Sequence, residues 1–368
     1  MGTVDQIRSG VVALGLPAPV DTAIHRIAAV YCVVVEVDCA GSTGLGYLST
    51  FERGQADALS ALVRDVAQVA LGSDSADVPG TVDRMRLRLD FIGRSGPSVP
   101  AVAAVESALW DAHARSLGVP LAHLGGIRHR SIPVYATGGF LALSRAELVA
   151  EAAGFRDAGY LGYKIKVGLP DWREDVARVA AVRRCIGPDL ALMVDANQGW
   201  TPWRARMIGA ALAEFDLAWI EEPLDAEDFA GQAQLATELT TPIGAGETVF
   251  GVRGIENLIQ HHAADVLTID AAKCGGVVAF RDAATLADRA RLPVTSHTFT
   301  PLSVQLMAAS PTATFIEHVP GWWDPLFDQH PQLTDGHYEI GSAPGIGSAL
   351  APEHRQHLIR IEPATTPN

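Results

Sequence analysis

The sequence predicts an α/β protein, in which a modified (β/α)₈ barrel of the TIM type follows an N-terminal α+β domain. Apolar, strand-like runs alternate with helix-like segments after Pro133, and no long linker interrupts them. Five of these runs end in an acid, at intervals of about 25 residues or about twice that, which suits strands alternating with helices. The five acids are Asp195, Glu221, Glu247, Asp270 and Glu317. Because the carboxyl ends of barrel strands meet at one rim, we expect these side chains to gather there.

The first third of the chain has a different pattern. Residues 30–37 form a strand-like run, a turn rich in small residues follows, and residues 45–48 resume the apolar pattern. Helical periodicity then appears over residues 55–71 and 99–117. We therefore predict an α+β domain over residues 1–130.

The predicted barrel covers residues 131–320. Its first helix, at 143–158, opens with Ser144 and Glu147 at the spacing of a capping box. The elements expected next are a strand at 163–167, a helix at 172–185 and a strand at 190–194. The periodicity fades near the end of the chain, and we expect residues 321–368 to pack back on the N-terminal domain.

The composition of the 368-residue chain limits what it can bind. Its net charge of −14 argues against nucleic-acid and anionic-membrane partners, because both need a basic surface. A small anionic substrate is compatible with this charge, since a few buried cations and a metal can reverse the local field. No apolar stretch approaches about 18 residues, no targeting pattern opens the chain, and the four cysteines lack C-x-x-C spacing. We expect a cytoplasmic protein with buried, reduced thiols.

Three of the acids, Asp195, Glu221 and Glu247, predict a metal site. Carboxylate oxygens without cysteine or paired histidine suit Mg²⁺ better than zinc. Each acid taken alone could instead cap the following helix or pair with a basic residue. Three at matched spacing favour the metal, because carboxylates that face one another repel without a cation.

Two lysines and a histidine predict acid–base chemistry. Lys164 and Lys166 lie two apart on one strand and so face the same side. Solvated lysines on an edge strand are the alternative, but a barrel has no open edge. Buried together, each lysine should lower the pKa of the other, which makes a usable base. His297 follows a strand one unit after Asp270, and a carboxylate that orients an imidazole gives a second base.

Two bases on opposite sides of a bound substrate suit removal of a weakly acidic proton next to a carboxylate. The lysine and the metal would neutralise the enolate dianion that results. Glu317, if protonated, could donate a hydrogen bond to the same substrate carboxylate.

These residues together resemble the mandelate racemase subgroup of the enolase superfamily. The matching motifs are Lys164-x-Lys166, Asp195-Ala-Asn197, Glu221-Glu222-Pro223, Gly246-Glu247, Asp270 before Lys273-x-Gly275-Gly276, His297 and Glu317. The resemblance implies a capping domain at the N-terminus, completed by the C-terminal tail, and a homo-oligomer. It implies Mg²⁺ on the three acids, Lys166 and His297 as the two bases, and Asp270 as the partner of His297. Lys164 would bind the substrate carboxylate and Glu317 would donate a hydrogen bond to it.

The segments around Glu221 and after Glu317 resemble those of galactarate and talarate dehydratases, which act on acid sugars. This favours dehydration of an acid sugar to a 2-keto-3-deoxy acid, with racemisation of a 2-hydroxy acid such as mandelate as the alternative. An apolar lid, formed by Val20, Ile24, Ile27 and Phe51, would suit mandelate, and ordinary packing between the two domains would also explain it. His25 and Arg26 lie between these residues and could contact hydroxyls or a distal carboxylate of a small-molecule carboxylate substrate. Gly139 stands where mandelate racemase has a serine, which departs from that enzyme. A metal-binding homologue without activity is disfavoured, since candidates for every role are present.

Overall fold

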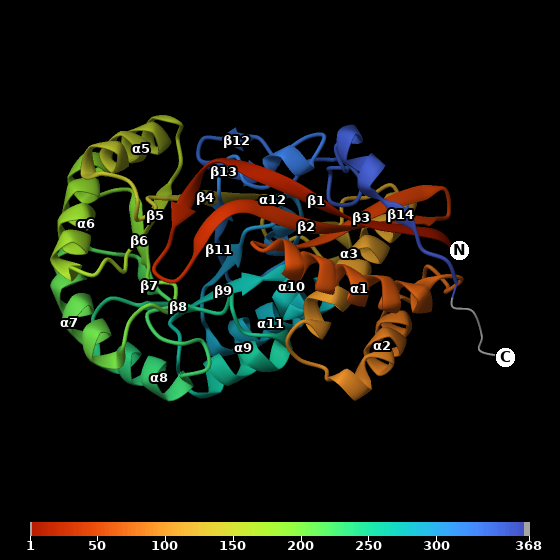
Figure 1. Ribbon diagram of the computed structural model, residues 1–368, viewed down its shortest axis with the longest axis horizontal. Helices are drawn as coiled ribbons and strands as arrows, with labels where there is room; N and C mark the ends of the chain where they lie inside the picture. Colours follow the sequence, from red (N-terminus) through yellow and green to blue (C-terminus); the bar gives the residue numbers. More distant parts are fainter. Residues whose placement is uncertain (1, 364–368) are drawn as a thin grey trace.

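Eight parallel strands close into a barrel in the computed structural model, which describes residues 2–363 (Figure 1). The barrel strands are β4 (Ser131–Gly138), β5 (Gly162–Lys166), β6 (Ala191–Asp195), β7 (Trp219–Glu221), β8 (Ile243–Ala245), β9 (Val266–Asp270), β10 (Val294–His297) and β11 (Ala313–His318). They pair in chain order, and the last strand closes on the first, where Glu317 lies opposite Tyr135. The predicted barrel is confirmed.

Helices cover the outside of the barrel and follow the strands that they connect. They are α5 (Arg145–Asp157), α6 (Trp172–Ile186), α7 (Pro202–Leu212), α8 (Phe229–Glu238), α9 (Gly251–Gln260), the short α10 (Ala271–Cys274), α11 (Val277–Ala290) and α12 (Thr300–Ala308). The expected capping box is present at the start of α5, where Ser144 and Glu147 bond reciprocally. After β11 the chain turns into a hairpin, and β13 (His337–Glu339) pairs antiparallel with β4. The barrel therefore departs from a regular (β/α)₈ barrel, because β13 adds an antiparallel strand beside β4.

The N-terminal domain is an antiparallel sheet with helices on one face. Its elements are β1 (Val4–Asp21), β2 (Arg26–Cys39), β3 (Ser42–Thr50), α1 (Arg53–Ala70), α2 (Val78–Arg88), α3 (Ser98–Ser116) and α4 (Ala122–Gly125). Strand β14 (Ile359–Arg360) of the tail pairs with β1, so the tail completes this domain as expected. The long β1 was not among the predicted strands, because polar residues and prolines interrupt its apolar pattern.

The sheet and α3 pack unusually close together. A Cβ atom at Gly46 would lie only 1.9 Å from the carbonyl oxygen of Ala104, and one at Gly44 only 2.1 Å from that of Ala108. The alanine-rich side of α3 therefore rests directly on the backbone of β3. Such close packing gives the capping domain a rigid core on which its loops are carried.

The β1–β2 hairpin reaches from the capping domain across the mouth of the barrel (Figure 1). At its tip the carbonyl oxygen of Asp21 accepts a hydrogen bond from Leu141 N, which follows β4. The side chain of Ala23 packs closely against Gly168 and Gly199, which follow β5 and β6. The hairpin tip thus rests on the rim where the barrel strands end.

None of the helices within residues 2–363 is long and apolar enough to cross a membrane. The four cysteines are free thiols, and three of them, Cys32, Cys39 and Cys274, are buried. Burial raises the pKa of the Cys32 thiol, which keeps it protonated and unreactive.

Candidate active site

The carboxyl ends of the barrel strands bring the expected side chains to one rim. Strand register places Lys166 beside Asp195, Asp195 beside Glu221, and Asp270 beside His297. The chain near this rim is also strained, because several residues that follow strands adopt left-handed backbone angles. They are Asn197, Gln198, Glu222, Thr298 and Phe299. Strain of this kind concentrates at functional sites, where surrounding structure holds it in place.

The three acids predicted to bind metal form one buried cluster. Asp195, Glu221 and Glu247 each offer a carboxylate oxygen, and these oxygens lie within 4.8 Å of one another. One buried oxygen, Glu247 Oε2, accepts no hydrogen bond from the described residues. The others are oriented from outside, since Trp219 Nε1 donates to Glu221 (2.7 Å) and Asn197 N donates to Asp195 (2.7 Å). An all-oxygen set with an unsatisfied member fits Mg²⁺.

The two lysines lie against these acids. Lys166 Nζ is 2.5 Å from Asp195 Oδ2, and Lys164 Nζ is 2.6 Å from Glu221 Oε1. Burial lowers the pKa of Lys166 and Lys164 lowers it further, but Asp195 and Glu247 together raise it more, so the net pKa lies above the ordinary value. The expected lowering between the lysines is therefore present but is outweighed. The reason is that carboxylates outnumber cations around each ammonium group.

His297 and Asp270 form the expected dyad. His297 Nδ1 is 2.7 Å from Asp270 Oδ2, while Asp270 Oδ1 accepts a hydrogen bond from Lys273 N at 2.7 Å. This leaves the other ring nitrogen, Nε2, free to face the cavity, 3.5 Å from Glu247 Oε2. Burial works against the imidazolium, but Glu247 and the Asp270 hydrogen bond raise the pKa of His297 to about 9. The dyad thus favours a proton on the imidazole.

Glu317 accepts hydrogen bonds in this arrangement and does not donate one. Its carboxylate receives bonds from Thr137 Oγ1 (2.6 Å), Lys164 Nζ (2.9 Å) and Thr298 N (3.1 Å). Burial opposes the charged form, yet Lys164 and His297 lower the pKa of Glu317 to about 2. The charged form of Glu317 is therefore favoured in this arrangement. A donor role would require a proton to arrive together with the substrate.

A cavity of about 190 Å³ opens above these groups. Its remaining polar lining consists of Thr22, His25, Ser49, Asn197, Gln198, Glu222, Thr248 and Lys273. Its apolar lining consists of Ile24, Ile27, Phe51, Phe140, Val319, Trp322 and Trp323. Phe140 stacks on Trp322 with ring centroids 5.2 Å apart, which gives the cavity one aromatic wall. The cavity is therefore polar near the acids and aromatic on one side.

Of the two hairpin residues predicted to bind substrate, the structure places only His25 at the cavity. Arg26 is absent from the lining, its side chain is 71% exposed, and its guanidinium pairs with Asp21 at 3.2 Å. The sequence did not single out Lys273, Trp322 or Phe140 as site residues. Lys273 belongs to the motif Lys273-x-Gly275-Gly276 and Trp322 lies in the segment after Glu317, whereas nothing in the sequence distinguishes Phe140.

Two family models account for most of the chain. One, described as enolase C-terminal domain-like, matches residues 147–354. The other, the N-terminal domain of mandelate racemase / muconate lactonizing enzyme, matches residues 7–126. The chain belongs to the mandelate racemase/muconate lactonizing enzyme family of the enolase superfamily. The resemblance inferred from the motifs is confirmed.

Within this family the chain is similar to several characterised enzymes. It is 36% identical to the L-talarate/galactarate dehydratase of Salmonella typhimurium, over 86% of this chain and 79% of that one. It is 33% identical to the 3,6-anhydro-alpha-L-galactonate cycloisomerase of Streptomyces coelicolor, over 94% of this chain and 97% of that one. The crystal structure of L-talarate dehydratase from Polaromonas sp. JS666, complexed with Mg and L-glucarate, superimposes with a TM-score of 0.92 at 34% identity and 98% coverage of both chains.

Gly139, the position that departs from mandelate racemase, leaves no room for a side chain. Its φ is +58°, and a Cβ atom there would lie 2.6 Å from Ile165 Cβ and 3.0 Å from Leu148 Cδ1. We expect Gly139→Ser to lower the free energy of unfolding by about 3 kcal/mol, through overpacking and left-handed strain. Urea denaturation would measure it. Gly154→Ala is the control: this helical glycine has no neighbour within 4 Å, so alanine should stabilise slightly. An equally stable Gly139→Ser variant would contradict the prediction.

Proposed function

We propose that this protein is a Mg²⁺-dependent acid-sugar dehydratase that abstracts the proton α to a carboxylate and eliminates the β-hydroxyl to give a 2-keto-3-deoxy acid. The observation that carries the proposal is the placement of Lys166 and His297 at the ends of β5 and β10. Strands β4 and β11 separate them on one side of the barrel, and β6 to β9 on the other. The acid cluster lies between these two groups, on β6, β7 and after β8. A substrate carboxylate held there would present its α-carbon to both.

Asp195, Glu221 and Glu247 would hold the cation, which supplies positive charge opposite the substrate carboxylate. Lys164 adds a second positive charge to the same region. Asp195 and Glu247 favour a proton on Lys166 in this arrangement, so the reaction requires Lys166 to lose that proton first. As the neutral amine, Lys166 Nζ takes the α-proton, and the electron pair of the C–H bond passes into an enolate. The pair then expels the β-oxygen, which accepts a proton from His297 Nε2 and leaves as water. The resulting enol tautomerises to the 2-keto acid, so atoms and charges balance.

Racemisation is the second candidate because it shares the first step. If His297 returns its proton to the α-carbon from the opposite face, the configuration inverts and no water is lost. The relatives named above favour elimination, since two of them are talarate or galactarate dehydratases. The polar lining near His25 and Lys273 also suits a hydroxylated chain, and the aromatic wall can contact the C–H face of a sugar acid.

Incubation with Mg²⁺ in D₂O tests both candidates. The panel would contain mono- and diacid sugars together with mandelate, followed by NMR and a 2-keto acid assay. A 2-keto product from an acid sugar is expected. Deuterium at the α-carbon without a keto product would instead establish racemisation. If neither a 2-keto product nor α-deuterium appears with any compound of the panel, the proposal is overturned and a homologue without activity is favoured.

The two neighbouring hairpin residues give a matched pair of variants. We expect His25→Asn to raise KM about tenfold with little change in kcat, because one hydrogen bond to the substrate is worth about 1.4 kcal/mol here. Arg26→Gln should leave KM within about twofold, since its guanidinium pairs with Asp21 outside the cavity. Steady-state kinetics on the best substrate of the panel would measure both. A larger effect of Arg26→Gln would mean that the hairpin rearranges on binding.

A further inference from the structure

A buried carboxylate of the capping domain lies at the start of a barrel helix. Glu106, on α3, is 1% exposed. Its Oε2 accepts a hydrogen bond from Val277 N at 2.7 Å and its Oε1 accepts one from Val278 N at 3.0 Å, although 171 residues separate Glu106 from Val277. Trp110 Nε1 donates a third bond at 3.0 Å. Both oxygens are therefore used, and two of the three donors belong to the first turn of α11.

The sequence at the start of α11 makes room for this carboxylate. The residue before the helix is Gly276, with φ of +99°, and it has no side chain that could cap the helix. A Cβ atom at Gly276 would lie 2.1 Å from Glu106 Oε2. A helix leaves its first N–H groups unpaired, and its N-terminus attracts negative charge. Glu106 thus supplies, from the other domain, the cap that α11 lacks.

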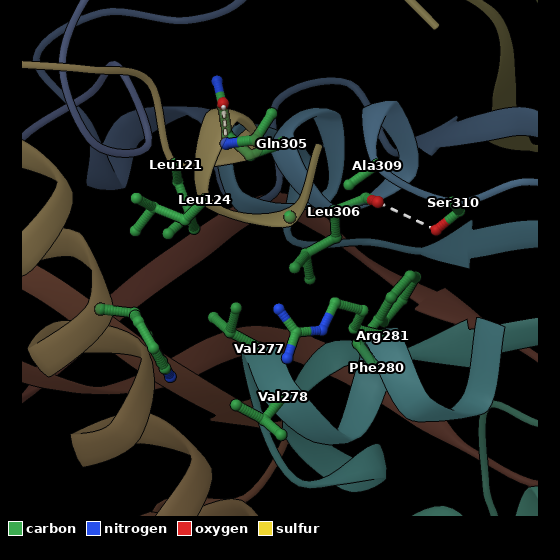
Figure 2. Close-up of a pocket in the computed structure, with 13 residues that line it drawn as sticks. Leu121, Leu124, Val277, Val278, Phe280, Arg281, Gln305, Leu306, Ala309 and Ser310 are labelled. Carbon is green, nitrogen blue, oxygen red and sulfur yellow. Dashed lines mark hydrogen bonds between the residues drawn. The ribbon is translucent and has the colours of Figure 1, made fainter. Parts of the chain in front are cut away.

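The side chains around the start of α11 are mostly apolar, with Arg281 and Gln305 among them. Figure 2 shows Val277 and Val278 at the start of α11, with Leu121 and Leu124 of the capping domain and Leu306 of α12 nearby. These side chains line a small cavity of about 30 Å³. Burial raises the pKa of Glu106 to about 7, and its three hydrogen bonds, with a smaller contribution from the charge of Arg86, offset part of that cost.

The capped turn is directly connected to the catalytic dyad. Only α10 and the Gly275–Gly276 turn separate Asp270 from Val277, and Gly276 N bonds to Ala271 O at 2.8 Å. Asp270 Oδ1 caps α10 and its Oδ2 holds His297. The segment from Asp270 to Val277 is therefore fixed at one end by β9 and at the other by Glu106. A shift of the start of α11 would turn α10 and move Asp270 against His297.

We propose that Glu106 is a positioning residue, which couples docking of the capping domain to the placement of Asp270 and so to the imidazole of His297. The proposal rests on the proposed function, because it concerns one of its two proton-transfer groups. It predicts that loss of Glu106 affects the face of the substrate served by His297. The face served by Lys166, on β5, should be unaffected.

Asp111 provides a matched control on the same helix. It is 0% exposed and accepts bonds from Leu45 N (2.8 Å), Ile346 N (2.7 Å) and Arg115 Nε (2.8 Å). These donors belong to the capping sheet, the tail and α3 itself, and none belongs to the catalytic rim. Asp111→Asn should therefore destabilise the protein without a preference for either face.

The decisive comparison is α-proton exchange in D₂O for Glu106→Gln and Asp111→Asn, with both epimers of the substrate. Glutamine keeps the shape of Glu106 but turns one acceptor into a donor that faces an N–H group. We expect exchange from the His297 face to fall at least tenfold in Glu106→Gln, while exchange from the Lys166 face stays within twofold. Asp111→Asn should change both faces by one common factor. Equal slowing of both faces in Glu106→Gln would overturn the proposal and leave Glu106 a purely structural group.

Backbone hydrogen exchange of residues 271–278 separates this proposal from the proposed function. It should accelerate in Glu106→Gln and stay unchanged in Asp111→Asn, whether or not a substrate is found. If wild-type protein exchanges no α-proton, the proposed function fails, and unchanged protection of 271–278 in Glu106→Gln would overturn the coupling independently. Should Glu106→Gln fail to fold, Glu106→Asp, which keeps the charge but shortens its reach, takes its place with the same expected outcomes.

Discussion

Lys166→Ala and His297→Asn are expected to abolish α-proton exchange from opposite faces of the substrate, each by about a thousandfold or more. A positioned general base contributes about 10²–10⁴ to a rate, and each variant removes one such group while the other remains. Lys166 is 8% exposed and His297 lies across the barrel, so neither can reach the proton served by the other. Proton NMR in D₂O, with each epimer supplied separately, would measure the two faces.

His318 offers a matched control for the histidine variant. It lies next to Glu317, but its ring bonds to Tyr160 (2.7 Å), Tyr338 (3.0 Å) and Asp324 (3.2 Å), away from the cavity lining. His318→Asn should lower stability and leave the ratio of the two exchange rates unchanged. If Lys166→Ala and His297→Asn each slowed both faces equally, the assignment of two opposed bases would be wrong.

The sequence predicted the rim of the barrel because its geometry is periodic. A strand, a helix and two loops repeat at nearly constant length, so the residue that ends each strand falls on the same rim. Asp195, Glu221, Glu247 and Asp270 could therefore be placed together without any knowledge of tertiary contacts. The capping domain was harder to predict from the sequence, because β1 is defined more by its pairing with β2 and β14 than by its own apolar pattern.

Two properties of the site depend on contacts that the sequence does not reveal: the position of the Arg26 side chain and the pKa values of the two lysines. His25 and Arg26 are neighbours on one hairpin tip, but His25 lines the cavity, whereas Arg26 is exposed and pairs with Asp21 outside it. The lysine pair shows the same limit for electrostatics. Sequence spacing reveals that Lys164 and Lys166 share one side of a strand, but not that Asp195 and Glu221 from other strands raise both pKa values. A pKa depends on all charges in a shell, and most of that shell is distant in sequence.

Removal of divalent cations is expected to reduce turnover to background, and Glu247→Gln to lower Mg²⁺ affinity by about a hundredfold or more. Glu247 Oε2 is a buried acceptor without a hydrogen bond among the described residues, so a cation is the partner that would satisfy it. Glutamine keeps the size of this side chain and removes its charge. Calorimetric titration with MgCl₂ would measure affinity, and a chelator followed by added Mg²⁺ would measure recovery of turnover.

Thermal unfolding gives a measurement of the same site that does not depend on activity. A ligand at a hundred times its Kd stabilises the folded state by about 2.7 kcal/mol, so Mg²⁺ should raise the Tm of the wild-type protein. Glu247→Gln should lose this increase, because the glutamine amide lacks the negative charge that would hold the cation.

Asp175 is the control acid for both measurements. It is also buried, on α6, but accepts bonds from Gly168 N and Leu169 N outside the acid cluster. Asp175→Asn should therefore lower the Tm and keep the Mg²⁺-dependent increase. If Mg²⁺ stabilised Glu247→Gln as much as the wild type, the cation would bind elsewhere.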